Sequence, residues 1–345
     1  LSLIGTSTLL GTVTILSLVI FFLMVSSAIR TYKTVDRLVT ALLVGSVPVA
    51  IYGWLQYFGL DPLDWSSGAL SPVHSTAGYS LFLGAYLGMV IPFTLCRIVG
   101  GEIDGRKRPI PYLLVLVLQV MCLLFTLSRG AWLGLLTSCL LFLWLVAYQW
   151  KKIWIIFLSI ILLIGGGYLF ISMNRSWVIP PPSLSSESSD IPVIRTRTAS
   201  DIGRTLLWKY TLPMISGRYL LGYGPETYFT AFWQYYPTES YPELGGLRAW
   251  DPHNIFLYHL TSTGVSGLVA FLWILYKFYR IAILKFIQGK DRHSMLTTAA
   301  ILCSASAFLV QAQFNPYSIL PLAIFWLVLA LGAGMHRMEA EQLAI

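Results

Sequence analysis

Charged side chains are scarce in this sequence. Only 11% of its 345 residues are Asp, Glu, Lys or Arg, whereas soluble globular domains carry about 25%. Hydrophobic residues make up 56% of the chain, and the mean hydropathy is +0.71. A chain with so little charge is not expected to fold around a core in water. The composition predicts a polytopic membrane protein.

Several chemical signatures are also absent. The four cysteines lie inside apolar runs and form no CxxC pair, so neither a disulfide framework nor a thiolate metal site is indicated. There is no Walker-type glycine loop and no HExxH pair. The nearest approach to a metal-binding acidic pair, Glu102-Ile103-Asp104, falls in a connection that we predict to be cytoplasmic. We therefore expect no metal and no other cofactor.

Apolar runs of about 20 residues, the length that crosses a bilayer core of ~30 Å, occur at about nine positions. They lie near 9–29, 38–60, 77–99, 110–128, 130–148, 153–173, 254–276, 296–314 and 318–335. The expected fold is an all-α, polytopic helical bundle with one long polar loop that contains short helices. Three parts follow from this pattern: a first bundle segment, 1–174, a loop domain, 175–253, and three last spans, 254–345.

The net charge of +8 does not indicate a nucleic-acid partner, because the basic residues form short runs between apolar segments, where they set topology. The runs at 30–37, 97–108, 151–152 and 277–292 alternate consistently and are predicted to be cytoplasmic. The connection 59–76, the turn at Arg129-Gly130 and the long loop then lie outside the cytoplasm. The chain begins at Leu1 without a methionine, and we expect further sequence upstream.

The long loop carries most of the polar residues that can do chemistry. Its Pro/Ser-rich part, 180–189, is predicted to be a flexible tether. Ser200 or Asp201 can then cap a helix that Gly217 ends. The aromatic segment 227–236 suits the headgroup level of a bilayer, with stacking on sugars as the alternative. Asp251 is a plausible N-cap with Pro252 at the first helical position, which places the next residue in the first turn of a membrane helix.

That next residue, His253, is the candidate for acid–base chemistry. The positive end of the helix dipole disfavours an imidazolium, so we expect a neutral ring that can accept a proton near neutral pH. The alternative is a histidine that only forms hydrogen bonds in the membrane interface. The sequence alone leaves both open.

Two arginines are candidates for binding an anion. Arg129 interrupts an apolar stretch too long for one span, and an ionisable group at that depth is a functional candidate by default. Arg204 shares a helix face with Trp208 at the i, i+4 spacing, and its planar fork of donors matches phosphate oxygens. The alternatives are an arginine that reaches headgroup phosphates and a solvated loop arginine. Further candidate substrate contacts are Arg248, Lys209, Trp208 and Asn254.

Four segments, in this order, resemble the O-antigen ligase and polymerase superfamily: TLSRGAWL at 126–133, GRTLLW at 203–208, LGYGP at 221–225 and HNIFLYHL at 253–260 followed by Gly264. Residues 75–87 are similar to a further family segment, although Gly78-Tyr79-Ser80-Leu81 stands where the family usually has Gly-Asn-Pro-Asn. The resemblance covers nearly the whole chain. Members usually have about twelve spans, which is consistent with sequence upstream of Leu1.

The resemblance implies a membrane glycosyltransferase of the bacterial plasma (inner) membrane. Such enzymes move a glycan from a polyprenyl (undecaprenyl) diphosphate carrier to an acceptor hydroxyl on the extracytoplasmic (periplasmic) side. The acceptor can be a glycolipid, another glycan or a protein, and membrane lipids surround the enzyme. The family's loop histidine and arginines match His253, Arg129 and Arg204, as catalytic base and as diphosphate ligands in an inverting, metal-independent transfer.

Three functions remain open at this point. A ligase attaches a finished glycan, whereas a polymerase of the same superfamily extends a lipid-linked chain with the same donor chemistry. The third is a transporter, which typically places ionisable groups near the bilayer midplane in repeated halves. Here the candidate charges are predicted at the external surface and no paired repeat is evident, so the transporter ranks below the enzyme.

Overall fold

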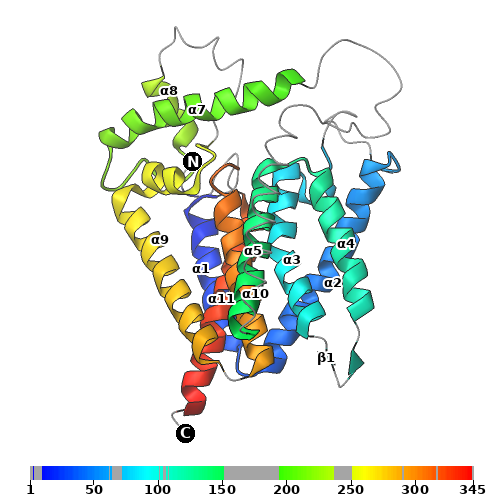
Figure 1. Ribbon diagram of the computed structural model, residues 1–345. Coiled ribbons are helices and arrows are strands. Elements are labelled where there is room, and N and C mark those ends of the chain that lie inside the picture. Colours follow the sequence, from blue (N-terminus) through cyan, green and yellow to red (C-terminus); the bar gives the residue numbers. More distant parts are fainter. Residues whose placement is uncertain are drawn as a thin grey trace. The chain divides into compact units, whose positions relative to one another are not determined.

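The computed structural model describes residues 3, 10–61, 63, 72–100, 102–103, 106–107, 109–150, 194–236, 251–289, 291–315 and 318–343 (Figure 1). Helices make up nearly all of this part of the chain. Among the described residues, the only strands are a two-residue antiparallel pair, Glu102–Ile103 with Arg106–Lys107. The predicted all-α class is therefore confirmed.

The apolar helices follow the predicted runs closely. Six are long and apolar enough to cross a membrane, and two are shorter. The long ones are α2 (Tyr32–Tyr57), α3 (Ser80–Gly100), α5 (Arg129–Trp150), α9 (Ile255–Gln288), α10 (Arg292–Gln311) and α11 (Ile319–Leu343), and the shorter ones are α1 (Thr12–Ala28) and α4 (Pro109–Phe125). The predicted run 153–173 lies outside the described residues. The chain is a multi-pass membrane protein, and the number of its spans stays a prediction.

Contacts divide the chain into two compact units, each described separately below. Unit 1 comprises Leu1–Phe21, Glu187–Lys277 and Ala312–Leu322. Unit 2 comprises Phe22–Ser186, Phe278–Gln311 and Ala323–Ile345. Each unit draws on segments far apart in sequence. The division into 1–174, 175–253 and 254–345 stays a prediction.

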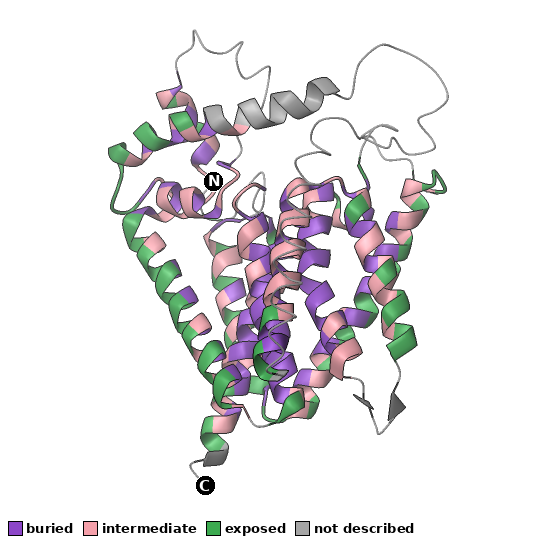
Figure 2. Ribbon diagram, in the orientation of Figure 1, coloured by how far each residue is buried: buried purple, intermediate pink, exposed green. Residues whose placement is uncertain are grey.

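The core of unit 2 is built on α3 and α10, whose residues are mostly buried (Figure 2). α10 packs against both α5 and α3. Its sequence from Ser294 to Ala307 is rich in Ala, Ser, Thr and Cys. Small side chains let helix backbones approach closely, which is the main source of packing energy between helices in lipid.

A buried polar chain joins three helices of unit 2. The Thr94 hydroxyl donates to Gln119 Oε1 (2.8 Å), and Gln119 Nε2 donates to Ser46 Oγ (2.7 Å). All three side chains are fully buried. A polar group is costly in an apolar interior unless it is paired, so these bonds favour one relative position of α2, α3 and α4.

Ion pairs connect the helix ends of unit 2 at the side predicted to be cytoplasmic. Arg97 on α3 pairs with Asp36 on α2 (2.9 Å), and His293 on α10 lies 3.2 Å from the same carboxylate. Lys285 on α9 pairs with Glu339 on α11 (2.7 Å). Residues that the sequence assigned only to topology thus also hold neighbouring helices together.

A kink divides α9 into a short arm and a long arm. Gly264 has φ 69° and ψ −168°, values that are not helical. The rings of His259 and Phe271 are stacked with centroids 4.2 Å apart, so the two arms fold toward each other. The predicted span 254–276 lies on α9 to within one residue but runs across this kink. The long arm, Val265–Gln288, is about 36 Å long at 1.5 Å per residue, enough to cross the bilayer by itself.

Candidate functional site

The His253 ring is bound to the carboxylate of Asp251. Nδ1 of His253 lies 2.6 Å from Asp251 Oδ1, and the same oxygen accepts the backbone N–H of His253 (2.6 Å). Because a carboxylate only accepts, Nδ1 carries the proton in this bond and Nε2 is the nitrogen that can accept one. Asp251 is 3% exposed, whereas the His253 side chain is 28% exposed. This arrangement suits a general base that a buried acid orients.

The start of α9 differs from the prediction. The helix begins at Ile255, and its first N–H groups are capped by Asn254 Oδ1, which accepts from Phe256 (3.0 Å) and Leu257 (3.1 Å). Asp251 is therefore not the N-cap, and His253 lies before the helix with φ 52°. Asparagine caps a helix as well as aspartate does, which leaves Asp251 available for the ring. The prediction of a histidine in the first helical turn was wrong.

The amide of Asn254 is also anchored on its nitrogen side. Asn254 Nδ2 donates to Gln313 Oε1 (3.1 Å), and the Ile255 N–H donates to the Ala312 carbonyl (2.9 Å). These bonds fix the segment directly after His253 to the chain just beyond α10. The structure thus gives Asn254 a positioning role, and its contact with substrate stays a prediction.

Helix α7 (Ile194–Gly217) is fastened to the other side of the His253 segment. The Trp208 indole N–H donates to the carbonyl oxygen of Pro252 (2.9 Å). Arg204 lies one turn earlier on the same face of α7 and is half-buried. Because Trp208 reaches the residue before His253, this face of α7 is directed toward the candidate base. The predicted pairing of Arg204 with Trp208 on one face is confirmed.

The ends of α7 were predicted only in part. The helix starts at Ile194, so neither Ser200 nor Asp201 caps it, and the predicted start was wrong. Apart from this, the predicted end at Gly217 is confirmed. The preceding segment, 180–189, lies outside the described residues.

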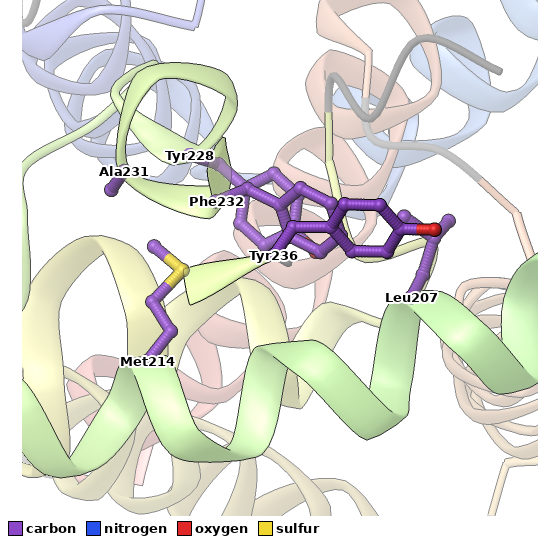
Figure 3. Close-up of a cluster of buried hydrophobic side chains, with 6 residues drawn as sticks. All are labelled: Leu207, Met214, Tyr228, Ala231, Phe232 and Tyr236. Atoms are coloured by element: carbon purple, nitrogen blue, oxygen red, sulfur yellow. The ribbon is translucent and has the colours of Figure 1, made fainter. Parts of the chain in front are cut away.

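A hydrophobic cluster packs α7 against α8 (Tyr228–Tyr235), as Figure 3 shows. Its buried members are Leu207, Met214, Tyr228, Ala231, Phe232 and Tyr236. The interfacial interpretation of the aromatic segment was therefore wrong for Tyr228, Phe232 and Tyr236, which form the core of unit 1. Because Leu207 precedes Trp208 in α7, this packing also holds Trp208 and Arg204 in place.

Two tyrosines of this region are not bases. Burial raises the pKa of Tyr228 far above its ordinary value, and its hydroxyl bonds to Thr211 Oγ1 (2.6 Å). Burial and a hydrogen bond to Tyr235 raise the pKa of Tyr223 to about 12. Both phenols are protonated near neutral pH, so neither competes with His253 as the proton acceptor.

The LGYGP segment packs backbone to backbone against the kink of α9. Tyr223 N–H donates to the Thr261 carbonyl (2.8 Å), and Val265 N–H donates to the Tyr219 carbonyl (2.8 Å). Gly222 and Gly264 both have positive φ. A Cβ on Gly264 would lie 2.3 Å from the Leu220 carbonyl carbon, and one on Gly222 would lie 2.6 Å from that of Ser262. Glycine is required at both places because two backbones touch there.

Arg129 belongs to unit 2, where it begins α5. The turn that precedes it is built on Thr126 and Ser128: Thr126 Oγ1 accepts the Ser128 N–H (3.3 Å), and Ser128 Oγ accepts the Ala131 N–H (3.4 Å). A turn is thus present between α4 and α5, but it lies at 126–128, and Arg129-Gly130, where it was predicted, begin the helix. A guanidinium at a helix N-terminus, where backbone N–H groups also point outward, suits an anion.

The remaining predicted contacts are less defined. Lys209 is exposed on α7, with its ammonium 5.2 Å from the centre of the Tyr210 ring. Arg248 lies outside the described residues. Within the described part of the chain, no three side chains of His, Cys, Asp or Glu come together as metal ligands would. The structure therefore places His253, Asn254, Trp208, Lys209 and Arg204 in unit 1 and Arg129 in unit 2.

Asp251 is the residue whose role the sequence did not predict. The available signal was its spacing, since an acid two residues before a histidine can reach the ring when the backbone turns between them. A second signal was Asn254, a residue type that caps helices as well as aspartate does.

Residues 114–272 match a family model described as O-antigen ligase. The matched segment contains Arg129, Arg204, His253 and Gly264, and does not reach residues 75–87. No curated protein and no solved structure matches the chain.

Proposed function

We infer that the chain has a ligase- or polymerase-like activity of the O-antigen ligase and polymerase superfamily, because residues 114–272 match a family model described as O-antigen ligase. We propose that this activity is the transfer of a glycan from a polyprenyl diphosphate, of the undecaprenyl type, to an acceptor hydroxyl. The observation that carries the proposal is the 2.6 Å bond between His253 Nδ1 and Asp251 Oδ1. Because this bond keeps the proton on Nδ1, Nε2 of the partly exposed ring is the nitrogen that can accept the proton of the acceptor hydroxyl.

The reaction then proceeds in one displacement. Nε2 of His253 takes the proton of the acceptor hydroxyl as its oxygen attacks the anomeric carbon. The bond between that carbon and the diphosphate oxygen breaks, and the polyprenyl diphosphate leaves with the bonding electrons. Attack opposite the leaving group inverts the anomeric configuration. A positioned general base contributes typically 10²–10⁴-fold to the rate of such a step.

Arg204 and Arg129 are assigned to the diphosphate. Negative charge grows on the leaving group in the transition state, and fixed cationic donors stabilise it without reorganisation. Arg204 is supported by its place on α7, which Trp208 fastens beside His253. Arg129 is supported by its position at the N-terminus of α5. The proposed location is the bacterial plasma membrane, with His253 and both arginines on the extracytoplasmic side.

The test is release of polyprenyl diphosphate from a lipid-linked oligosaccharide by the purified protein in liposomes, without added metal or ATP. Extracts of the source cell envelope serve as acceptor. His253→Ala, Arg204→Ala and Arg129→Ala are expected to lose acceptor-dependent release. His293→Ala is the matched control, because His293 lies at the start of α10, on the side predicted to be cytoplasmic. This variant should retain acceptor-dependent release.

The product mass separates the two activities within the superfamily. A single addition to the acceptor identifies a ligase, whereas a ladder spaced by one repeat unit identifies a polymerase. If none of the acceptors promotes release, or if the His253→Ala protein is as active as the parent, the transferase mechanism is wrong and transport becomes the leading function.

A further inference from the structure

The loop that follows α7 is coloured as exposed in Figure 2, and its residues carry large apolar side chains. Tyr219 and Leu220 are each 57% exposed, and Leu221 is 78% exposed. They are consecutive and lie outside any helix, so no amphipathic pattern explains their exposure. Contiguous exposed apolar groups of this kind mark a surface that something apolar covers.

This loop has a fixed position. Val265 N–H donates to the Tyr219 carbonyl (2.8 Å), and Ser266 Oγ donates to the Leu220 carbonyl (2.9 Å). Gly264 packs against the Leu220 backbone between these two bonds. The exposed side chains therefore lie where the long arm of α9 begins.

The long arm carries an apolar stripe that starts at the same point. Its exposed members recur at spacings of three and four, which places them on one helix face. Val265, Val269, Leu272 and Tyr276 follow this spacing, and Trp273 and Ile274 are exposed beside Leu272. Because α9 is long and apolar enough to cross a membrane, acyl chains are the expected cover of this stripe. The loop extends the same surface past the end of the helix.

Charge at the edge of the loop fits a lipid headgroup. Arg218 is exposed and directly precedes Tyr219, and its guanidinium carbon lies 5.2 Å from the centre of the Tyr223 ring. Arginine and tyrosine are favoured at the membrane–water interface, where the apolar part of each side chain lies in the bilayer and the polar end reaches the phosphates.

We propose that Arg218–Leu221 is a membrane anchor of unit 1. Leu220 and Leu221 insert among the acyl chains of the leaflet that the long arm of α9 enters, and Arg218 binds lipid phosphate at its surface. The anchor holds the LGYGP segment and the kink of α9 at the bilayer surface. It does not depend on which reaction the protein catalyses.

The test places an environment-sensitive NBD probe on Leu221→Cys, in protein reconstituted in phosphatidylethanolamine and phosphatidylglycerol vesicles. Of the native cysteines, Cys96, Cys122 and Cys303 are buried and Cys139 is partly buried, and labelled parent protein supplies the blank for all four. NBD emission should be shifted to the blue. Lipids brominated on the acyl chains should quench it, as expected for a group about 5–10 Å inside the headgroup boundary. A probe at Tyr219→Cys should respond in the same direction.

The matched control is Lys209→Cys, an exposed position on α7 in the same unit. Its probe should emit as in water and be quenched little. The proposal is overturned if the Leu221 probe is quenched no more than the Lys209 probe. A blue-shifted probe that bromine does not quench would also overturn it, because the cover would then be protein. Quenching that changes on tenfold dilution of protein into lipid would identify a second copy as the cover and count against the anchor.

Discussion

At the scale of single residues, a substitution of Asp251 should show whether this residue orients the His253 ring or only supports the fold. Asp251→Asn removes the negative acceptor from His253 Nδ1 and leaves side-chain size unchanged. We expect the transfer rate to fall about 10²-fold with little change in KM, because the base is misdirected in the transition state and substrate binding is retained. The measurement is kcat and KM of polyprenyl diphosphate release in liposomes.

A second readout tests whether the effect acts through the ring. In ¹⁵N-histidine-labelled protein, the ring nitrogen shifts should report a protonated Nδ1 in the parent and a mixture of tautomers in Asp251→Asn. Asp291→Asn, which changes the carboxylate that caps α10 in unit 2, is the control. If kcat falls while the His253 ring signals stay as in the parent, Asp251 does not orient the ring.

The sequence predicted His253 but not its environment, for a physical reason. Asp251, Pro252 and Asn254 each favour a helix start, and local sequence preference does not decide which of these starts is used. The choice is made by tertiary contacts: Trp208 holds the Pro252 carbonyl, and Gln313 holds the Asn254 amide. Local propensity therefore placed the helix cap three residues too early, at Asp251 in place of Asn254, and gave the histidine the wrong backbone conformation.

At the scale of elements, the contact between the LGYGP loop and the α9 kink predicts a severe effect of small substitutions. Gly264→Ala introduces a Cβ at 2.3 Å from the Leu220 carbonyl carbon, in a conformation that is essentially restricted to glycine. We expect a loss of about 2–3 kcal/mol in stability. Thermal unfolding in detergent measures it.

Gly88→Ala is the matched control, since a Cβ there meets nothing within 4 Å. It should unfold at or slightly above the midpoint of the parent, because its Cβ has room although the residue is buried, and alanine is favoured over glycine inside a helix. An equal midpoint for Gly264→Ala and Gly88→Ala would show that the two backbones do not touch. Gly222→Ala, on the other side of the contact, should behave like Gly264→Ala.

The buried chain Ser46–Gln119–Thr94 gives a prediction for the bundle. Gln119→Ala leaves the Thr94 hydroxyl without its acceptor and opens a cavity among α2, α3 and α4. The expected destabilisation is about 1–3 kcal/mol, measured by unfolding in mixed micelles. Val117→Ala, an exposed position on the same helix, is the control and should change little. Equal unfolding midpoints for the two variants would contradict the role of the polar chain.

Hydropathy predicted the apolar helices well but did not predict the kink inside α9. Eight of the nine apolar runs coincide with apolar helices because burial in lipid demands about 20 continuous apolar residues. Gly264 lies inside such a run, so hydropathy continues through the kink. The structure breaks the helix there because Gly222 brings a second backbone against it, and a pairing of residues 42 positions apart leaves no periodic signal.

At the scale of the whole molecule, the charge pattern predicts which ends of the helices face the cytoplasm. The runs around Lys33, Arg97 and Lys285 contain most basic residues of the short connections, and such connections stay in the cytoplasm because translocating them is unfavourable. The long loop carries Lys209 and Arg218 and is nevertheless predicted outside, since long segments translocate largely regardless of charge. The predicted sides of the short connections and of the long loop can be tested with the same chemistry.

A membrane-impermeant maleimide applied to intact spheroplasts should label Lys209→Cys and spare Lys33→Cys, which should react only after permeabilisation. Both positions are exposed; of the native cysteines, Cys96, Cys122 and Cys303 are buried and Cys139 is partly buried, so the labelling of the parent protein is subtracted as background. The reverse pattern would place His253 and Arg204 on the cytoplasmic side. A transferase there would meet its lipid-linked donor before export, and the extracytoplasmic mechanism would have to be abandoned even if the His253→Ala protein were inactive. Labelling at both positions would instead mean that the spheroplasts leak, which a cytoplasmic marker protein detects in the same sample.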